Sequence, residues 1–139
     1  MKKLLVRLLL LGVLGVPAVA GASTWKLDAS HSSVLFSVKH MMVTNVRGSL
    51  QVTAGSLTLN DKAGLPTKVE GTVDAKSINT LHTKRDKHLR AEDFLFTEKF
   101  STLTFVSKKV EKTGKQIQVT GDLTLRGKTK SVTFVGDLT

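Results

Sequence analysis

Apolar and polar residues alternate along most of this chain, and the alternation restricts the folds open to it. Between residues 34 and 39, Val34, Phe36 and Val38 occupy every second position. A period of two places successive side chains on opposite faces, so the segment is predicted to be a half-buried β-strand. Further strands are predicted at 24–28, 46–59, 69–73, 103–105, 117–125 and 132–135, with turns at 60–64, 112–115 and 126–127. Short strands joined by tight turns predict a mainly β protein, an antiparallel barrel or sandwich.

One segment interrupts the strand pattern. Residues 81–91 contain no Gly, no Pro and no run of β-branched residues, and polar residues suited to helix capping precede them. A short helix of about two or three turns is therefore predicted around 81–91. One face of this helix is predicted to carry Leu81, Arg85, His88 and Leu89, so its apolar stripe is narrow. The helix is expected to dock through its ends and through the neighbouring Phe94 and Phe96.

The N-terminus has the pattern of a cleaved secretory signal. Lys2, Lys3 and Arg7 precede an apolar run at 8–16, and the small-residue sequence Ala18-Val19-Ala20 follows. Residues 1–20 are predicted to be a signal peptide, cleaved after residue 20 or 22, that directs residues 23–139 to the periplasm. The alternative is an uncleaved anchor, but the apolar run is shorter than the ~20 residues that span a bilayer. The chain has no Cys, so its stability must come from burial and sheet hydrogen bonds.

The chain is strongly basic. Of its 21 Lys and Arg residues, three lie in the predicted signal peptide, and the remaining 18 stand against 11 acidic residues, a net charge of +7. A basic surface attracts anionic lipid headgroups, so contact with a membrane surface is one prediction. The alternative is that Lys side chains solvate outward strand faces and protect sheet edges. Nucleic acid is not an expected partner, because base stacking needs exposed aromatic residues and the chain has one Trp and no Tyr.

Neither a metal site nor a catalytic centre is predicted. The four His residues lack the spacing of helical metal ligands, and no carboxylate joins them at a recognisable spacing. Asp28, His31, Ser32 and Ser33 contain the residue types of a nucleophilic triad, but they lie within one turn and no Gly-x-Ser-x-Gly elbow surrounds them. Asp28 and Ser30 are instead expected to satisfy the backbone of that turn. The chain is predicted not to be an enzyme.

Four groups of residues, in order along the chain, carry a family resemblance. They are Trp25-Lys26-Leu27-Asp28 with His31-Ser32, His40-Met41-Met42 through Val46-Arg47-Gly48, Arg85-Asp86-Lys87-His88-Leu89-Arg90 with Asp93-Phe94, and Gly121-Asp122-Leu123-Thr124 with Gly127. Together they make the chain resemble the YceI-like family of secreted, lipocalin-like polyisoprenoid-binding proteins. The resemblance implies a lipocalin-like antiparallel β-barrel that holds the tail of a polyisoprenoid, such as a quinone, or of another long amphiphile. It implies no other cofactor.

The resemblance also raises an expectation about the end of the chain. Family members continue for several strands beyond the position matched by Thr139. Residues 23–139 are therefore expected to form a C-terminally truncated YceI-like domain whose barrel is incomplete. An incomplete barrel leaves an unpaired strand edge, so a homo-oligomer formed through that edge is predicted.

The alternating faces supply candidates for the lining of a cavity. They are Phe36, Val38, Leu50, Val73, Phe105, Val119 and Leu123 from the strands, with Leu89 and Phe94 from the helical cover. An apolar tail buried there contributes ~0.8 kcal/mol per CH₂ before ordering costs are deducted. The alternative is that these residues fill a solid core. In that case the chain is a structural or protein-interaction β domain with no lipid ligand.

Arg85 and His88 have two interpretations. One is contact with the polar headgroup of a ligand, and the other is anchoring of the helix to the barrel rim through nearby carboxylates. Taken together, the sequence predicts a periplasmic protein that binds or carries a polyisoprenoid, quinone-like or other long-chain amphiphilic lipid, without chemistry of its own.

Overall fold

A computed structural model describes residues 21–137, and the predicted signal peptide lies outside the described residues. Strands dominate this range: β1 (Ala22–Lys26), β2 (Ser33–His40), β3 (Thr44–Asn60), β4 (Leu65–Asn79), β5 (Thr102–Thr113), β6 (Gln116–Leu125) and β7 (Lys128–Asp137). A short 3-10 turn, η1 (Ala29–His31), precedes β2, and the helix α1 (Thr83–Arg90) lies between β4 and β5. The prediction of a mainly β fold with a short helix around 81–91 is confirmed.

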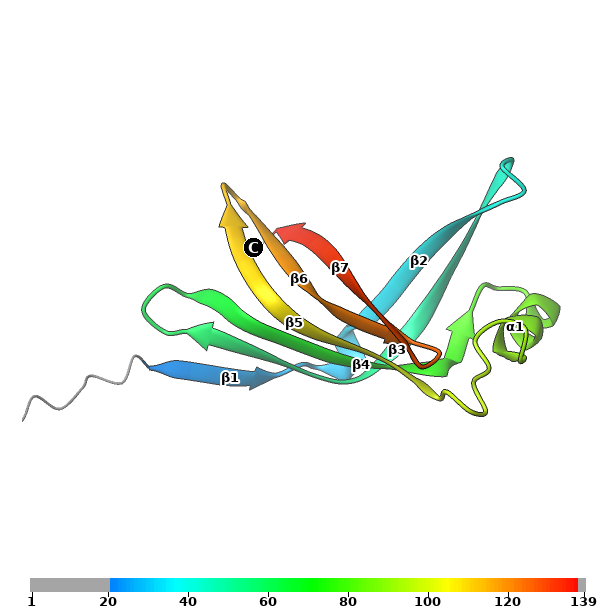
Figure 1. The fold of residues 1–139 in the computed structure, drawn as a ribbon, viewed down its shortest axis with the longest axis horizontal. Coiled ribbons are helices and arrows are strands. Elements are labelled where there is room, and N and C mark those ends of the chain that lie inside the picture. Colours follow the sequence, from blue (N-terminus) through cyan, green and yellow to red (C-terminus); the bar gives the residue numbers. More distant parts are fainter. Residues whose placement is uncertain (1–20, 138–139) are drawn as a thin grey trace, which may run out of the picture.

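All seven strands belong to one antiparallel sheet, in which six follow the order β1-β3-β4-β5-β6-β7 and β2 pairs with β3 off this path. The long strand β3 pairs with β4 along one edge and with both β1 and β2 along the other. The sheet is strongly curved: in Figure 1, β5, β6 and β7 rise on one side of the molecule and the far end of the β2–β3 hairpin rises on the other. Among the described residues, β2 and β7 do not pair with each other, so the sheet forms an open trough.

At three of the predicted turns, a glycine has the positive φ that favours this residue. Gly64, Gly114 and Gly127 have φ of 60°, 63° and 67°, where a Cβ is disfavoured. Register shifts at three places in the β3–β4 pairing and one in the β5–β6 pairing bend the sheet further. The sequence-based turns and the observed turns therefore agree at these three connections.

The β2–β3 turn differs because its two central residues are methionines. The Val43 N–H donates to the His40 carbonyl oxygen at 3.2 Å, and Met41 and Met42 have φ of 51° and 60°. Positive φ at both central positions is the pattern of a type I′ turn, which favours Asn-Gly. Methionine is uncommon in that region, so no sequence signal marked residues 41–43 as a turn.

Gly121 allows two strands to approach closely on the concave face of the sheet. A Cβ added there would come within 2.4 Å of the Val106 carbonyl oxygen and 2.6 Å of the Ser107 Cα. The contact adjoins the register shift between Ser107 and Lys109. A side chain at this position of β6 would therefore have to displace the backbone of β5.

Substituting Gly121 by Ala should lower the free energy of unfolding by about 1–3 kcal/mol, because the added methyl group meets backbone that is fixed in the β5–β6 ladder. Urea denaturation followed by circular dichroism measures the change. Gly71→Ala in β4 is the matched control, since nothing lies within 4 Å of the Cβ it would add. Its free energy of unfolding should stay within about 0.5 kcal/mol of the original. Equal losses at the two positions would contradict the close approach.

Candidate functional site

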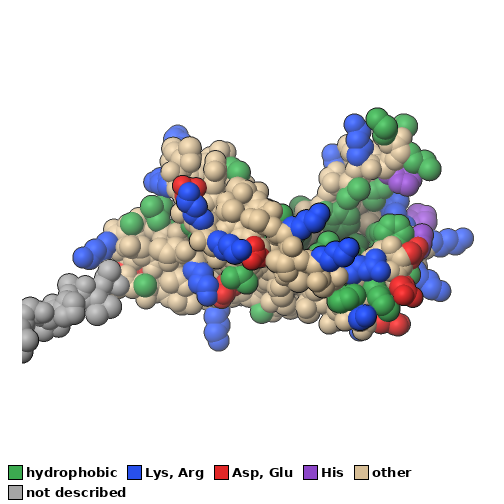
Figure 2. Space-filling view, in the orientation of Figure 1, with side chains coloured by type: hydrophobic (Ala, Val, Ile, Leu, Met, Phe, Trp, Pro, Cys, Tyr) green, Lys and Arg blue, Asp and Glu red, His purple; other side chains and the backbone are tan. Residues whose placement is uncertain are grey.

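The concave face of the trough is lined by apolar side chains around a cavity of about 1120 Å³. Alternation turns every second residue of each strand to this face. The apolar residues that border the cavity are Leu27, Val34, Leu35, Phe36, Val38, Leu50, Val52, Val69, Val73, Ile78, Leu89, Phe94, Leu95, Leu103, Phe105, Leu123, Leu125 and Phe134. In Figure 2 the molecule is hollowed between the β5–β7 side and the β2–β3 hairpin, with hydrophobic side chains inside the hollow.

Eight of the nine predicted lining residues border this cavity: Phe36, Val38, Leu50, Val73, Leu89, Phe94, Phe105 and Leu123. Val119 does not. It lies on the same face of β6 but pairs with Val110 and Phe134, closer to the β5–β6 turn. A period of two identifies the face of a strand but not how far along the strand a cavity extends. That the eight residues bind a ligand stays a prediction.

Phe134 borders the cavity although it was not among the predicted lining residues. Its ring lies edge-on to that of Phe105, with centroids 5.1 Å apart and an interplanar angle of 78°. The two residues come from β5 and β7, and β6 lies between them in the sheet. Gly121 of β6 makes room for the contact, because a Cβ there would come within 2.7 Å of the Phe105 ring. The alternation of Val132 and Phe134 was the only sequence signal for this position.

Polar residues are sparse in the cavity wall. They are His31, Ser32, Ser33, Glu70, Asp93 and Thr104. Across residues 21–137, no group of three or more His, Asp or Glu side chains is placed to hold a metal ion. Within the same range, no helix is both long and apolar enough to cross a membrane. The chemistry that this wall offers is therefore mainly apolar contact, with a few dispersed hydrogen-bonding groups.

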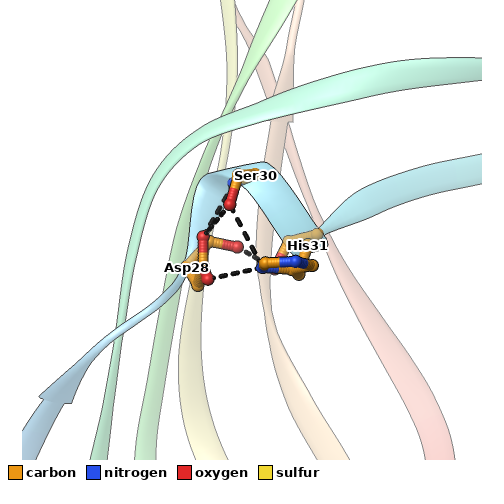
Figure 3. A network of polar contacts seen from close by, with 4 residues as sticks. Asp28, Ser30 and His31 are labelled. Carbon is orange, nitrogen blue, oxygen red and sulfur yellow. Dashed lines mark hydrogen bonds and ion pairs between the residues drawn. The ribbon is translucent and has the colours of Figure 1, made fainter.

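A compact polar network holds His31 at the cavity wall (Figure 3). The Asp28 carboxylate lies 2.6 Å from His31 Nδ1 and accepts a hydrogen bond from the Ser30 hydroxyl at 2.5 Å. The Ser30 hydroxyl also lies 3.1 Å from the same Nδ1. The Ser30 N–H donates to the Asp28 carboxylate at 2.9 Å, which confirms that Asp28 satisfies the backbone of this turn. The Ser30 hydroxyl bonds side chains instead, and the serine whose hydroxyl meets the backbone is Ser32, at 2.6 Å from the Asp28 carbonyl oxygen.

This network does not have the geometry of a nucleophilic triad. In a triad, the carboxylate and the hydroxyl meet opposite nitrogens of the imidazole, whereas here both meet Nδ1. The Ser30 hydroxyl and then His31 hold the pKa of the Asp28 carboxyl below its ordinary value. The network therefore orients the His31 ring. Sequence reasoning missed His31 as a cavity residue, because its position depends on the turn that precedes β2.

Helix α1 is fastened to the end of β4 by polar contacts. The buried Asp86 carboxylate accepts hydrogen bonds from the Thr80 N–H at 2.8 Å and the Thr80 hydroxyl at 2.6 Å. The bond from the Thr80 hydroxyl is the main cause that lowers the pKa of Asp86; burial opposes the shift, and the charges of Arg90 and Arg85 add to it. Arg90 donates to the carbonyl oxygens of Lys76 and Ile78, each at 2.7 Å. The predicted stripe is not formed, because Leu81 precedes α1 and is 93% exposed, which leaves Leu89 as the apolar residue of the helix. Hydrogen bonds hold the helix in place instead.

Arg85 and His88 both take part in this fastening. Arg85 donates to the Thr80 hydroxyl at 2.7 Å and to the Thr80 carbonyl oxygen at 2.9 Å. His88 Nε2 lies 2.5 Å from the Asp93 carboxylate, and its ring lies edge-on to Phe94 with centroids 4.7 Å apart. Neither residue borders the cavity. Their geometry favours anchoring over headgroup contact, although Arg85 bonds a hydroxyl and a carbonyl oxygen instead of the expected carboxylate.

Asp86→Asn should lower the free energy of unfolding at neutral pH by about 1–3 kcal/mol, because the two hydrogen bonds from Thr80 lose their charged acceptor, although an amide oxygen can still accept them. The folded-state pKa of Asp86 is depressed, so its stabilising contribution is present above the unfolded pKa of about 3.9 and is lost as the pH falls through the folded value. The difference between the two proteins should therefore shrink in acid. Urea titrations at neutral and acidic pH test this, with the exposed Glu92→Gln as control. If the difference in free energy of unfolding between the original protein and Asp86→Asn did not change with pH, the stabilising role of the ionised Asp86 would be contradicted.

Comparison with known proteins agrees with this architecture. The sequence model of the YceI-like domain matches residues 25–139. Protein YceI of Escherichia coli O6:H1 is 38% identical over 140 residues, covering 99% of this chain and 73% of that protein. Protein YceI of Salmonella newport is 36% identical over the same shares of the two chains.

Solved structures of similar fold include two bacterial proteins. The Campylobacter jejuni YCEI protein superimposes with a TM-score of 0.58 at 30% identity, covering 80% of this chain and 66% of that one. Burkholderia cenocepacia BcnA has a TM-score of 0.62 at 22% identity, covering 78% and 68% of the two chains, and shows likeness of fold alone. With a family match along nearly all of the described residues and relatives above 30% identity, this chain belongs to the YceI-like domain family.

Proposed function

We propose that this protein binds and carries a long-chain amphiphile, such as a polyisoprenoid or quinone-like lipid, in the trough. The observation that carries the proposal is an apolar cavity of about 1120 Å³, at or above the upper end of the roughly 300–1,000 Å³ of small-molecule sites. Several lining side chains remain open to solvent: Val38 is 57% exposed, Phe94 46% and Phe134 52%. Apolar surface of this extent, gathered in one concavity, is suited to an apolar ligand.

The shape and chemistry of the wall favour a tail over a compact polar molecule. Lining residues extend from Val38 in the β2–β3 hairpin to Leu125 at the end of β6, so an extended chain can contact apolar side chains along its length. Each buried CH₂ of such a tail contributes ~0.8 kcal/mol. The dispersed polar groups, His31 among them, are suited to orienting one polar end. We propose no reaction for this site and regard the protein as a carrier without chemistry of its own.

The proposed compartment is the periplasm. It rests on the pattern of residues 1–20, in which basic residues, a short apolar run and small residues follow one another. A carrier of water-insoluble lipids has a clear use in an aqueous compartment between membranes.

The exposed edge of β7 supports a second candidate, a protein-interaction domain. Within residues 21–137, β7 pairs with β6 on one side and with no strand on the other. Phe134 and Val135 on this strand are 52% and 56% exposed. An unpaired edge with apolar side chains can add a strand from a second copy of the chain.

Filling the cavity separates a carrier from a domain with a solid core. Val73→Trp in the floor of the trough should weaken binding of a fluorescent isoprenoid probe at least roughly tenfold, because the indole occupies volume that the tail needs. It should leave the free energy of unfolding unchanged or higher, whereas overpacking a solid core costs about 1–3 kcal/mol. Ser131→Trp, exposed on β7, is the control for adding an indole. Destabilisation by Val73→Trp without any effect on binding would refute the carrier proposal.

Native mass spectrometry of the protein purified from its own periplasm tests the proposal directly. We expect the mass of the chain without residues 1–20, or without 1–22, together with a bound lipid that organic solvent extracts. A lipid-free dimer that pairs through β7 would favour the interaction domain. Recovery of intact residues 1–139 from the membrane fraction would contradict the proposed compartment.

A further inference from the structure

The tip of the β2–β3 hairpin, residues 39–47, has an apolar surface that the described chain does not cover. Met41, Met42 and Val43 are 81%, 87% and 84% exposed. The hairpin projects from the body of the molecule (Figure 1), and hydrophobic side chains gather at its end (Figure 2). Three consecutive exposed apolar residues at the end of a projecting hairpin are typical of a surface that meets a partner.

The backbone conformation at the tip is unfavourable for methionine. Met41 and Met42 both have φ in the left-handed region, where Asn-Gly fits better than Met-Met. The side chains of the two methionines are almost fully exposed, so packing within the described chain does not compensate the cost. Backbone strain that no packing within the described chain offsets indicates that the two methionine side chains contact a partner.

The charge around the tip has one sign. Lys39 and Arg47 flank the apolar residues, and residues 29–60 contain no Asp or Glu. Helix α1 lies at the same end of the molecule as the hairpin tip in Figure 1, and it carries the exposed Lys84 and Lys87. An apolar tip flanked by basic residues complements a bilayer interface, in which acyl chains lie beneath anionic headgroups. Nucleic acid is less suited, because residues 39–47 contain no Phe, Trp or Tyr for base stacking.

We propose that the hairpin tip docks on an anionic phospholipid surface. Met41, Met42 and Val43 enter the headgroup–acyl boundary, and Lys39 and Arg47 meet the lipid phosphates. The tip also leads into the cavity, since Val38 and Phe36 border it and lie just below the turn on β2. Lipid loading along this face of β2 rests on the proposed function, whereas the docking does not depend on it.

Sedimentation with phospholipid vesicles tests the docking. Purified protein is mixed with vesicles of phosphatidylcholine alone or with roughly a quarter phosphatidylglycerol, at low and high salt. We expect binding to the anionic vesicles, weakened by salt. Met41→Asn combined with Met42→Gly should lower the partition coefficient roughly tenfold or more, because two apolar side chains are removed from the interface. The same pair suits the turn geometry, so the variant should fold at least as well as the original.

Charge variants separate the tip from general basicity. Lys39→Gln with Arg47→Gln should weaken anionic-vesicle binding several-fold more than Lys112→Gln with Lys115→Gln, which removes two charges from the β5–β6 hairpin. Equal losses would overturn the assignment of docking to the tip. Failure of the original protein to bind anionic vesicles would also overturn it. So would a dimer that the Asn-Gly variant dissociates, because the tip would then meet a second copy.

Site-specific labels report insertion directly, because the chain has no Cys. A polarity-sensitive fluorophore at Met42→Cys should shift its emission to the blue on anionic vesicles, and one at Thr113→Cys should not.

A second measurement separates the docking proposal from the carrier proposal. It is the retention of an isoprenoid probe, without vesicles, by the variant that combines Met41→Asn with Met42→Gly. Loss of docking with retained probe is the expected result. Docking without any probe retention in the original protein would refute the carrier and leave the docking in place.

Discussion

The curvature of a single antiparallel sheet is the constraint on which the rest of this structure depends. Bulges in the β3–β4 and β5–β6 pairings bend the strands. Glycines on the concave side, with Gly121 the clearest case, let neighbouring backbone and aromatic rings come close. The bend gathers alternate side chains of six strands around one hollow. A flatter sheet with the same alternation would have an apolar face but no cavity.

The helix completes the wall without contributing to a hydrophobic core of its own. Its buried residue is Asp86, which with Arg85 bonds Thr80, the residue that follows β4. Arg90 bonds two carbonyl oxygens of β4 itself. Hydrogen bonds fix orientation more strictly than apolar packing does, because they need particular distances and angles. Leu89 of this short, polar helix and Phe94 of the turn that follows it can therefore face the hollow.

Asp28, Ser30 and His31 have the residue types of a nucleophilic triad but not its geometry. An aspartate, a serine and a histidine lie within four positions of one another and form hydrogen bonds. Both partners meet the same imidazole nitrogen, so they hold the ring in place and do not form a proton relay. The apolar wall and the half-exposed lining support the proposal that the protein holds an apolar ligand.

Local sequence determined much of this protein. Alternation identified the strands and their inward faces, glycine marked three turns, and the break at 81–91 located the helix, because all of these depend on neighbours within a few residues. Tertiary structure decided what depends on distance in space. It left Val119 outside the cavity and brought Phe134 into it, because sheet curvature determines where along a strand the hollow lies. It directed Arg85 to Thr80, and it placed two methionines in a strained turn that no local signal marked. A period of two shows which way a side chain points, but only the folded sheet decides what stands opposite it.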